Sequence, residues 1–220
     1  LLSDGRVALL CDLAGPGYGE PVVHLSLSED EGLTWSTPID TGIVGIVPDR
    51  LIEFSPTEWG LSVHWARPED RDKQLPFSQR LYATEDAGRT WALRGIVGED
   101  DYRAFCEASI IKHPDGRLIA YMRENSFLHQ PTYVSFSNDK GRTWSPPDYH
   151  PTFGHRHSAG LLDRETVLLT YRNVVGNPGL QAWVGGVSEV GYQVGGKDLS
   201  HLSLSQGEDG LRVLIQDVER

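Results

Sequence analysis

The octet SEDEGLTW, residues 28–35, indicates the fold because the chain contains three octets of this pattern. It returns as TEDAGRTW at residues 84–91 and as SNDKGRTW at residues 137–144. The repeats start 56 and 53 residues apart. A period of this kind, with several short strands in each repeat, is typical of propeller blades and not of helical solenoids. We therefore expect an all-β protein, a β-propeller.

Each octet has the residues of a self-contained turn. The leading serine or threonine and the aspartate can bond to nearby backbone N–H groups, and the glycine adopts a left-handed backbone without a Cβ clash. The tryptophan can pack beneath the turn. This chemistry predicts a structural element, placed between the third and fourth strands of a blade, and not an active site.

The rest of each repeat predicts a four-stranded antiparallel meander. Asp4-Gly5 and Asp115-Gly116 lie between apolar runs, where Asp-Gly is a strong hairpin signal. Third strands are expected at residues 22–28 and 131–137. About four blades fit the period, so we expect residues 1–220 to be a single propeller domain that lacks its N-terminal part. The tail from residue 187 has no clean octet and is expected to be a degenerate blade or a closing set of strands.

The composition limits the classes of partner that the protein is expected to bind. The net charge of -11 argues against a nucleic-acid binder, which needs a basic surface for phosphates. No apolar run approaches the roughly 18 residues that would predict a membrane span. The two cysteines, Cys11 and Cys106, are no disulfide framework and leave the compartment undetermined.

In a meander, the first strands begin and the second strands end on one face, here called the axial face, opposite the octets. Polar and aromatic residues gather at these strand ends. They are Asp12, Arg50, Trp65, Arg67, Arg103, Glu107, Arg123, Glu124, His155, Arg156, His157, Tyr171 and Arg172. An acidic protein that concentrates arginine in this way is expected to bind an anion there, because guanidinium pairs with carboxylate through two parallel hydrogen bonds.

The octets resemble the Asp-boxes, or BNR repeats, of the sialidase (neuraminidase) superfamily. The segment CEASIIKHPDGRLIAYMREN, residues 106–125, also resembles the sialidase segment in which a glutamate precedes a hairpin and an arginine ends the return strand. The resemblance extends over most of residues 1 to about 175. It implies a six-bladed propeller.

The resemblance also implies roles for particular residues. Glu107 matches the glutamate that polarises a tyrosine nucleophile, and Arg123 matches one of three arginines that grip the substrate carboxylate. A tyrosine has an ordinary pKa of about 10, so it needs a neighbouring carboxylate to become a nucleophile. Asp12 or Glu20 lies where the family has its acid/base aspartate. Gln181 lies near the position of another family arginine, and the family's tyrosine comes from a blade later than Tyr171.

The leading hypothesis is a sialidase-like exo-glycoside hydrolase that acts on an anionic terminal sugar. The candidate catalytic residues are Glu107, Tyr171 and Asp12; the candidate substrate-binding residues are Arg123, Arg156, His157, Arg172 and Trp65. Two alternatives remain open. One is a polysaccharide lyase in which His157 and Tyr171 exchange protons around a uronic acid, and the other is a non-catalytic propeller that binds glycan or protein. No cofactor is expected, and no metal, because His150, His155 and His157 have no carboxylate or cysteine at a recognisable spacing.

Overall fold

The protein is built from β-strands. The computed structural model describes residues 1–14, 20–66, 77–126, 130–173, 179–191, 205–206 and 212–214. Every regular element within these ranges is a strand, which confirms the predicted all-β class. Among the described residues we find no helix of the length and apolarity that crossing a bilayer requires.

The strands form consecutive sheets that match blades. The first sheet contains β1 (Val7–Ala14), β2 (Pro21–Ser28) and β3 (Ile39–Val44). The second contains β4 (Ile52–Glu53), β5 (Trp59–Ala66), β6 (Phe77–Thr84) and β7 (Ala92–Gly98). The third contains β8 (Phe105–Lys112), β9 (Leu118–Glu124), β10 (Tyr133–Ser137) and β11 (Asp148–Tyr149). All neighbouring strands in these sheets are antiparallel, as the meander requires.

The last sheet begins as a meander and then departs from it. β12 (His155–Leu161), β13 (Thr166–Asn173) and β14 (Gly179–Gly186) pair antiparallel in sequence order. Two short tail strands, β15 (Ser205–Gln206) and β16 (Arg212–Leu214), complete the sheet, and β16 pairs with β14 in the parallel direction. The described part of the tail, residues 205–206 and 212–214, therefore pairs in a way that differs from the antiparallel fourth strand of an ordinary blade.

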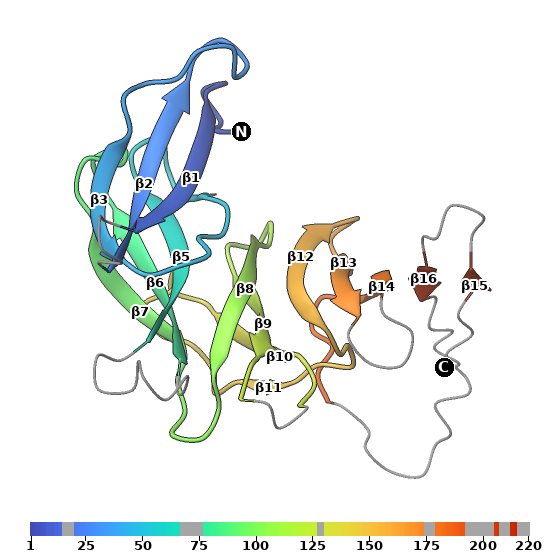
Figure 1. The fold of residues 1–220 in the computed structure, drawn as a ribbon. Helices are drawn as coiled ribbons and strands as arrows, with labels where there is room; N and C mark the ends of the chain where they lie inside the picture. Colours follow the sequence, from blue (N-terminus) through green and yellow to red (C-terminus); the bar gives the residue numbers. More distant parts are fainter. Residues whose placement is uncertain are drawn as a thin grey trace.

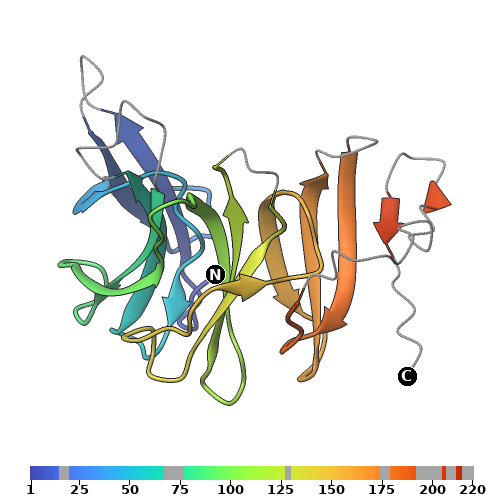
Figure 2. The ribbon, with the colours of Figure 1, turned by 90° about the horizontal axis from the view of Figure 1, so that it is seen from below.

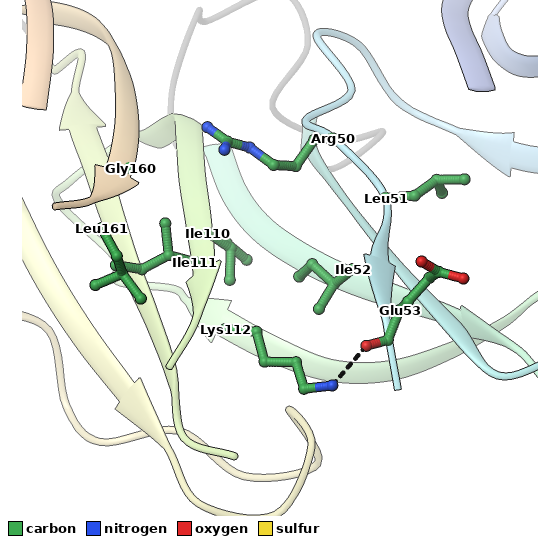
Figure 3. A pocket seen from close by; sticks show the side chains of 9 residues that line it. All are labelled: Arg50, Leu51, Ile52, Glu53, Ile110, Ile111, Lys112, Gly160 and Leu161. Carbon is green, nitrogen blue, oxygen red and sulfur yellow. Dashed lines mark hydrogen bonds between the residues drawn. The ribbon is translucent and has the colours of Figure 1, made fainter. Parts of the chain in front are cut away.

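The sheets follow one another in an arc, with the first strands on the inside (Figures 1 and 2). The chain around β4, together with β8 and β12, lines a hollow of about 270 Å³ (Figure 3). Arg50 lies at one end of it, and Lys112 donates a hydrogen bond to the backbone oxygen of Glu53 at the other, at 2.7 Å. This is the arrangement of blades around a propeller axis.

All three octets form turns of the predicted kind. In the second and third sheets they lie between the third and fourth strands, and in the first sheet the octet lies between β2 and β3, so β1 takes the place of a second strand. In the first, Ser28 Oγ accepts the Gly32 N–H at 2.8 Å, and the Asp30 carboxylate accepts the N–H and hydroxyl of Thr34 at 2.8 and 2.6 Å. The other two octets repeat these bonds residue for residue. Each octet therefore satisfies its own backbone donors, and its aspartate is occupied within the turn.

Hydrophobic clusters lie between neighbouring sheets and fix their order. Trp59 and Leu25 join the first and second sheets. Leu81 and Met122 belong to the cluster between the second and third, and Tyr121 to the one between the third and fourth. Burial of such large side chains stabilises the sheet stack by about 1.5–3 kcal/mol each. The rigid stack holds the strand ends of the axial face in place.

Candidate functional site

Strand register defines equivalent positions on the axial face. The first residue of each octet pairs with the start of a second strand: Ser28 with Val7, Thr84 with Trp59, and Ser137 with Leu118. Five residues farther along those second strands lie Asp12, His64 and Arg123. Three blades therefore present an acid, a histidine and an arginine at one structural position, at the strand end opposite the octets.

The first strands carry an equivalent irregularity. In three blades, a residue of the inner chain segment pairs with the second strand: Ile46 with His64, Cys106 with Arg123, and His155 with Arg172. The backbone of the next residue is left-handed in each case. The three left-handed residues are Val47, Glu107 and Arg156, with φ of 54°, 46° and 49°. This conformation costs a non-glycine residue about 1–2 kcal/mol, and such strain gathers at functional sites. A bulge of this kind re-aims the side chain that it carries.

Glu107 and Arg123 are brought together, as their spacing and the resemblance predicted. Arg123 Nη1 donates to Glu107 Oε1 at 2.9 Å, and Nη2 donates to Asn125 Oδ1 at 2.6 Å. The two side chains keep only 16% and 14% of their surface exposed. Among the described residues, neither Glu107 Oε2 nor Arg123 Nε has a hydrogen-bond partner, although both atoms are buried. The pair therefore retains an unused acceptor and an unused donor, which is costly unless a ligand or water meets them.

Two histidines flank this pair. His64 Nδ1 accepts the backbone N–H of Glu107 at 3.4 Å, and burial, with a smaller contribution from Arg123, lowers the pKa of His64 to about 4. His155 Nδ1 accepts from Arg172 Nη2 at 3.0 Å. Burial and the charges of Arg123 and Arg172 lower the pKa of His155 as well. Both rings are therefore neutral at pH 7 and can accept protons.

Asp12, Arg156 and Arg172 lie within electrostatic range of the two histidines, and Trp65 follows His64 in β5. Asp12, Arg156 and Arg172 are exposed. The charge of Asp12 raises the pKa of His64 and that of Arg156 lowers it, which places both residues within electrostatic range of the histidine. The Trp65 ring is covered by the guanidinium of Arg80, 4.0 Å from the ring centroid. That stacking occupies one face of the indole.

Tyr171 and His157 do not reach the axial face. Tyr171 is 3% exposed within a hydrophobic cluster, and burial raises its pKa to about 12. His157 is 4% exposed, stacks on Tyr171 at 5.1 Å and bonds to Thr132 Oγ1 at 2.9 Å. Both side chains pack between the third and fourth sheets and not on the axial face, where they were expected. Their catalytic and substrate-binding roles stay predictions.

Other predicted positions have settled partners or fall elsewhere. Arg103 pairs with Asp100 at 2.8 Å, and Glu124 Oε1 accepts backbone N–H groups from Ala104 and Ser126. Glu124 Oε2 is buried and has no hydrogen-bond partner among the described residues. Gln181 is buried in β14. Glu20 directly precedes β2, and Arg67 lies outside the described residues. Within the described part of the chain, no three histidine, cysteine, aspartate or glutamate side chains are grouped to hold a metal ion.

His64 is the site residue that sequence reasoning missed. It lies in the apolar run LSVHWA and resembles a core histidine. The signal that identifies it is the register: it lies five residues beyond the strand partner of an octet, as Arg123 does.

The sequence matches the BNR repeat-like domain family over residues 3–172. The chain belongs to the BNR repeat-like family. Its fold is that of the sialidase-like propellers. No curated protein matches this BNR repeat-like chain.

Solved structures show the same fold at low identity. A protein of unknown function from Dyadobacter fermentans DSM 18053 is 20% identical, with a TM-score of 0.68 over 84% of this chain and 58% of that one. The Hadza microbial sialidase Hz136 is 16% identical, with a TM-score of 0.63 over 87% and 44%. A PL25 ulvan lyase bound to -[GlcA(1-4)Rha3S]- is 12% identical, with a TM-score of 0.53 over 78% and 44%. This BNR repeat-like chain thus spans about half the length of the structures it matches.

Proposed function

We propose that this propeller is a glycan-active enzyme, a sialidase-like exo-glycoside hydrolase that acts on an anionic terminal sugar at the axial face. The observation that carries the proposal is the ion pair of Glu107 and Arg123, held on a left-handed bulge with one carboxylate oxygen unpartnered among the described residues. Structural ion pairs do not need a strained backbone or an unused buried acceptor. Both features suit a group that meets a substrate.

The sugar's carboxylate would be bound by the exposed arginines. Arg123 is engaged with Glu107 and Asn125, whereas Arg156 and Arg172 are exposed next to them in the following blade. Guanidinium groups recognise carboxylate in a bidentate geometry. We therefore assign Arg156 and Arg172 to the charged end of the substrate. The half-buried Trp65 is a candidate platform for the sugar face.

Glu107 would act as the base. Its Oε2 can accept the proton of an attacking hydroxyl group, a tyrosine in the sialidase-like case, while Arg123 holds Oε1. Asp12, exposed at a strand end of the first sheet, would donate a proton to the departing glycosidic oxygen. The bond between the anomeric carbon and that oxygen breaks, and the sugar passes to the nucleophile and then to water.

A lyase is the second candidate, and the neutral histidines favour it. His155 and His64 are both uncharged at pH 7 and flank the Glu107–Arg123 pair. A neutral imidazole can remove the proton next to a uronate carboxylate when arginines stabilise the resulting negative charge. In this reading His155 replaces the buried His157 as the base.

A panel of acidic glycosides separates the candidates. Full-length protein is incubated with fluorogenic sialosides and uronosides and, separately, with uronate polysaccharides. Release of the fluorophore, abolished in Glu107→Gln, is the result expected for the hydrolase. Growth of the ultraviolet absorbance of an unsaturated uronate, lost in His155→Ala, would show that the protein cleaves by elimination and not by hydrolysis. Glycan binding without turnover would contradict both and identify a binding module.

A further inference from the structure

The bulge that carries Glu107 is held by side chains of the preceding blade. Three acceptors from the second sheet meet three backbone N–H groups of β8. His64 Nδ1 accepts from Glu107 at 3.4 Å, Gln79 Oε1 from Ala108 at 3.4 Å, and Asp49 Oδ2 from Ile110 at 2.7 Å.

The bulge creates the need for the first two of these acceptors, whereas Ile110 lies beyond it in regular pairing with β9. β8 pairs with β9 at Cys106 and again at Ser109, and the register shifts between them. The N–H groups of Glu107 and Ala108 therefore lie where the strand pairing is interrupted. A buried N–H without a partner costs about 1–3 kcal/mol, so the side chains of the second sheet replace the missing partners.

The acceptors are themselves fixed. Gln79 is fully buried, and its Nε2 donates to Ser62 Oγ at 2.6 Å, so that its oxygen points to Ala108. Ser62 Oγ in turn donates to the backbone oxygen of Arg80 at 3.1 Å. His64 is 5% exposed and neutral, which leaves Nδ1 as an acceptor. None of these groups has to reorganise to hold the bulge.

The neighbouring bulge shows that this is not a general feature of the blades. At Arg156, among the described residues, the contact that recurs is the last one: Ser109 Oγ accepts the Ala159 N–H at 3.1 Å, as Asp49 does for Ile110. The residues of the third sheet that correspond to His64 and Gln79 are Arg123 and Thr132. An arginine has no acceptor atom, and Thr132 bonds to His157. The full set of three acceptors belongs to Glu107.

We propose that His64, Gln79 and Asp49 are positioning residues that fix the left-handed backbone at Glu107 and so aim its carboxylate at Arg123 and the substrate. The three residues are called the cradle below. The assignment of a catalytic task to Glu107 rests on the proposed function, whereas the effect of the cradle on the backbone does not. A displacement of about 1 Å at a reacting group can lower the rate about 100-fold, so a cradle of this kind has a large kinetic effect.

Paired substitutions test the cradle in the full chain. His64→Leu and Gln79→Met remove an acceptor and keep similar volume. His64→Asn restores an acceptor near the position of Nδ1, and Gln79→Glu restores Oε1. We expect kcat on the acidic glycoside to fall about 10- to 100-fold in the first pair and KM to change less than about twofold. The second pair should recover most of the loss. His24→Leu is the matched control, because the described partner of the His24 ring is the backbone oxygen of Val22 within its own strand.

Hydrogen exchange supplies a readout that does not require turnover. The amides of Glu107 and Ala108 should exchange at least 10-fold faster in His64→Leu and Gln79→Met, with thermal unfolding still cooperative. Unchanged exchange at these amides would overturn the cradle whatever the substrate. If wild type turns over and His64→Leu keeps its kcat, the cradle is also overturned while the proposed function stands. A rise in KM at constant kcat would instead make His64 a substrate contact and overturn the positioning role. If wild type shows no turnover but exchange responds as expected, the proposed function fails and the cradle stands as a backbone support.

Discussion

Glu107 and Arg156 occupy the same position in consecutive blades, each one residue after the first strand pairs with the second, and each with a left-handed backbone of φ 46° and 49°. The two blades thus share the backbone conformation at this position and differ in the side chain that it carries. One blade offers a carboxylate and the next a guanidinium at the axial face. A carboxylate and a guanidinium side by side are what the proposed site for an acidic sugar uses.

The octet glycines differ in how much space surrounds them, which predicts different losses of stability when each is replaced by alanine. Gly32 and Gly141 both have positive φ, 91° and 83°. A Cβ on Gly32 would meet only the edge of Trp35 at 3.5 Å, whereas one on Gly141 would collide with Leu81. Gly32→Ala should cost about 1–2 kcal/mol through the backbone alone, and Gly141→Ala about 1–3 kcal/mol more. Urea unfolding measures both, and equal costs would contradict the packing of the third octet against the second sheet.

The octet aspartates are predicted to be structural. Asp86 accepts the N–H groups of Arg89 and Thr90 and the hydroxyl of Thr90. Asp86→Ala should lower the thermal midpoint by several degrees and leave kcat at the folded temperature nearly unchanged. The exposed Asp101→Ala is the control and should change neither. A loss of kcat without loss of stability would place the chemistry on the octet face instead.

The sequence was sufficient for the blades and for one pair of site residues. Octet turns depend on local chemistry, so their position was predictable from residues 28–35 alone, and Glu107 with Arg123 followed from a local hairpin. His157 could not be placed, because the register shift between His155 and Ser158 breaks the alternation on which strand-face predictions depend. Tyr171 and Arg172 are neighbours in β13, so their side chains point to opposite faces of the sheet, and Tyr171 packs against the third sheet. The role of His64 depends on a contact between blades, which no local pattern contains.

Buried histidines predict a loss of stability in mild acid. Burial lowers the pKa of His64 to about 4 and those of His150 and His157 to about 3. Between pH 6.5 and 4 the unfolded chain therefore binds protons that the folded chain does not, and the free energy of unfolding falls as the pH falls. Burial raises the pKa of Asp49, so the folded chain binds a proton there more readily than the unfolded chain, and this opposes the fall in stability. Urea unfolding at a series of pH values should show this dependence of the free energy of unfolding on pH. His64→Asn should reduce the slope by the equivalent of about one bound proton. A flat profile over this range would contradict the burial of the three rings.

Arg172 is predicted to recognise the charge of the substrate. Arg172→Ala should raise KM for a glycoside with a free carboxylate at least 10-fold and change KM for its methyl ester less than about threefold. The exposed octet variant Arg89→Ala is the control and should leave both constants unchanged. Equal effects on acid and ester would show that Arg172 acts on folding or on another part of the sugar.

The central claim is that Glu107 acts on the substrate from the axial face, and one comparison tests it most directly. Glu107→Gln is compared with Glu124→Gln, a glutamate on the adjacent strand whose Oε1 accepts two backbone N–H groups that an amide oxygen can also accept. We predict that turnover of an acidic glycoside falls at least 1,000-fold in Glu107→Gln and less than about threefold in Glu124→Gln, with both variants folded. Full turnover in a folded Glu107→Gln protein would contradict the account.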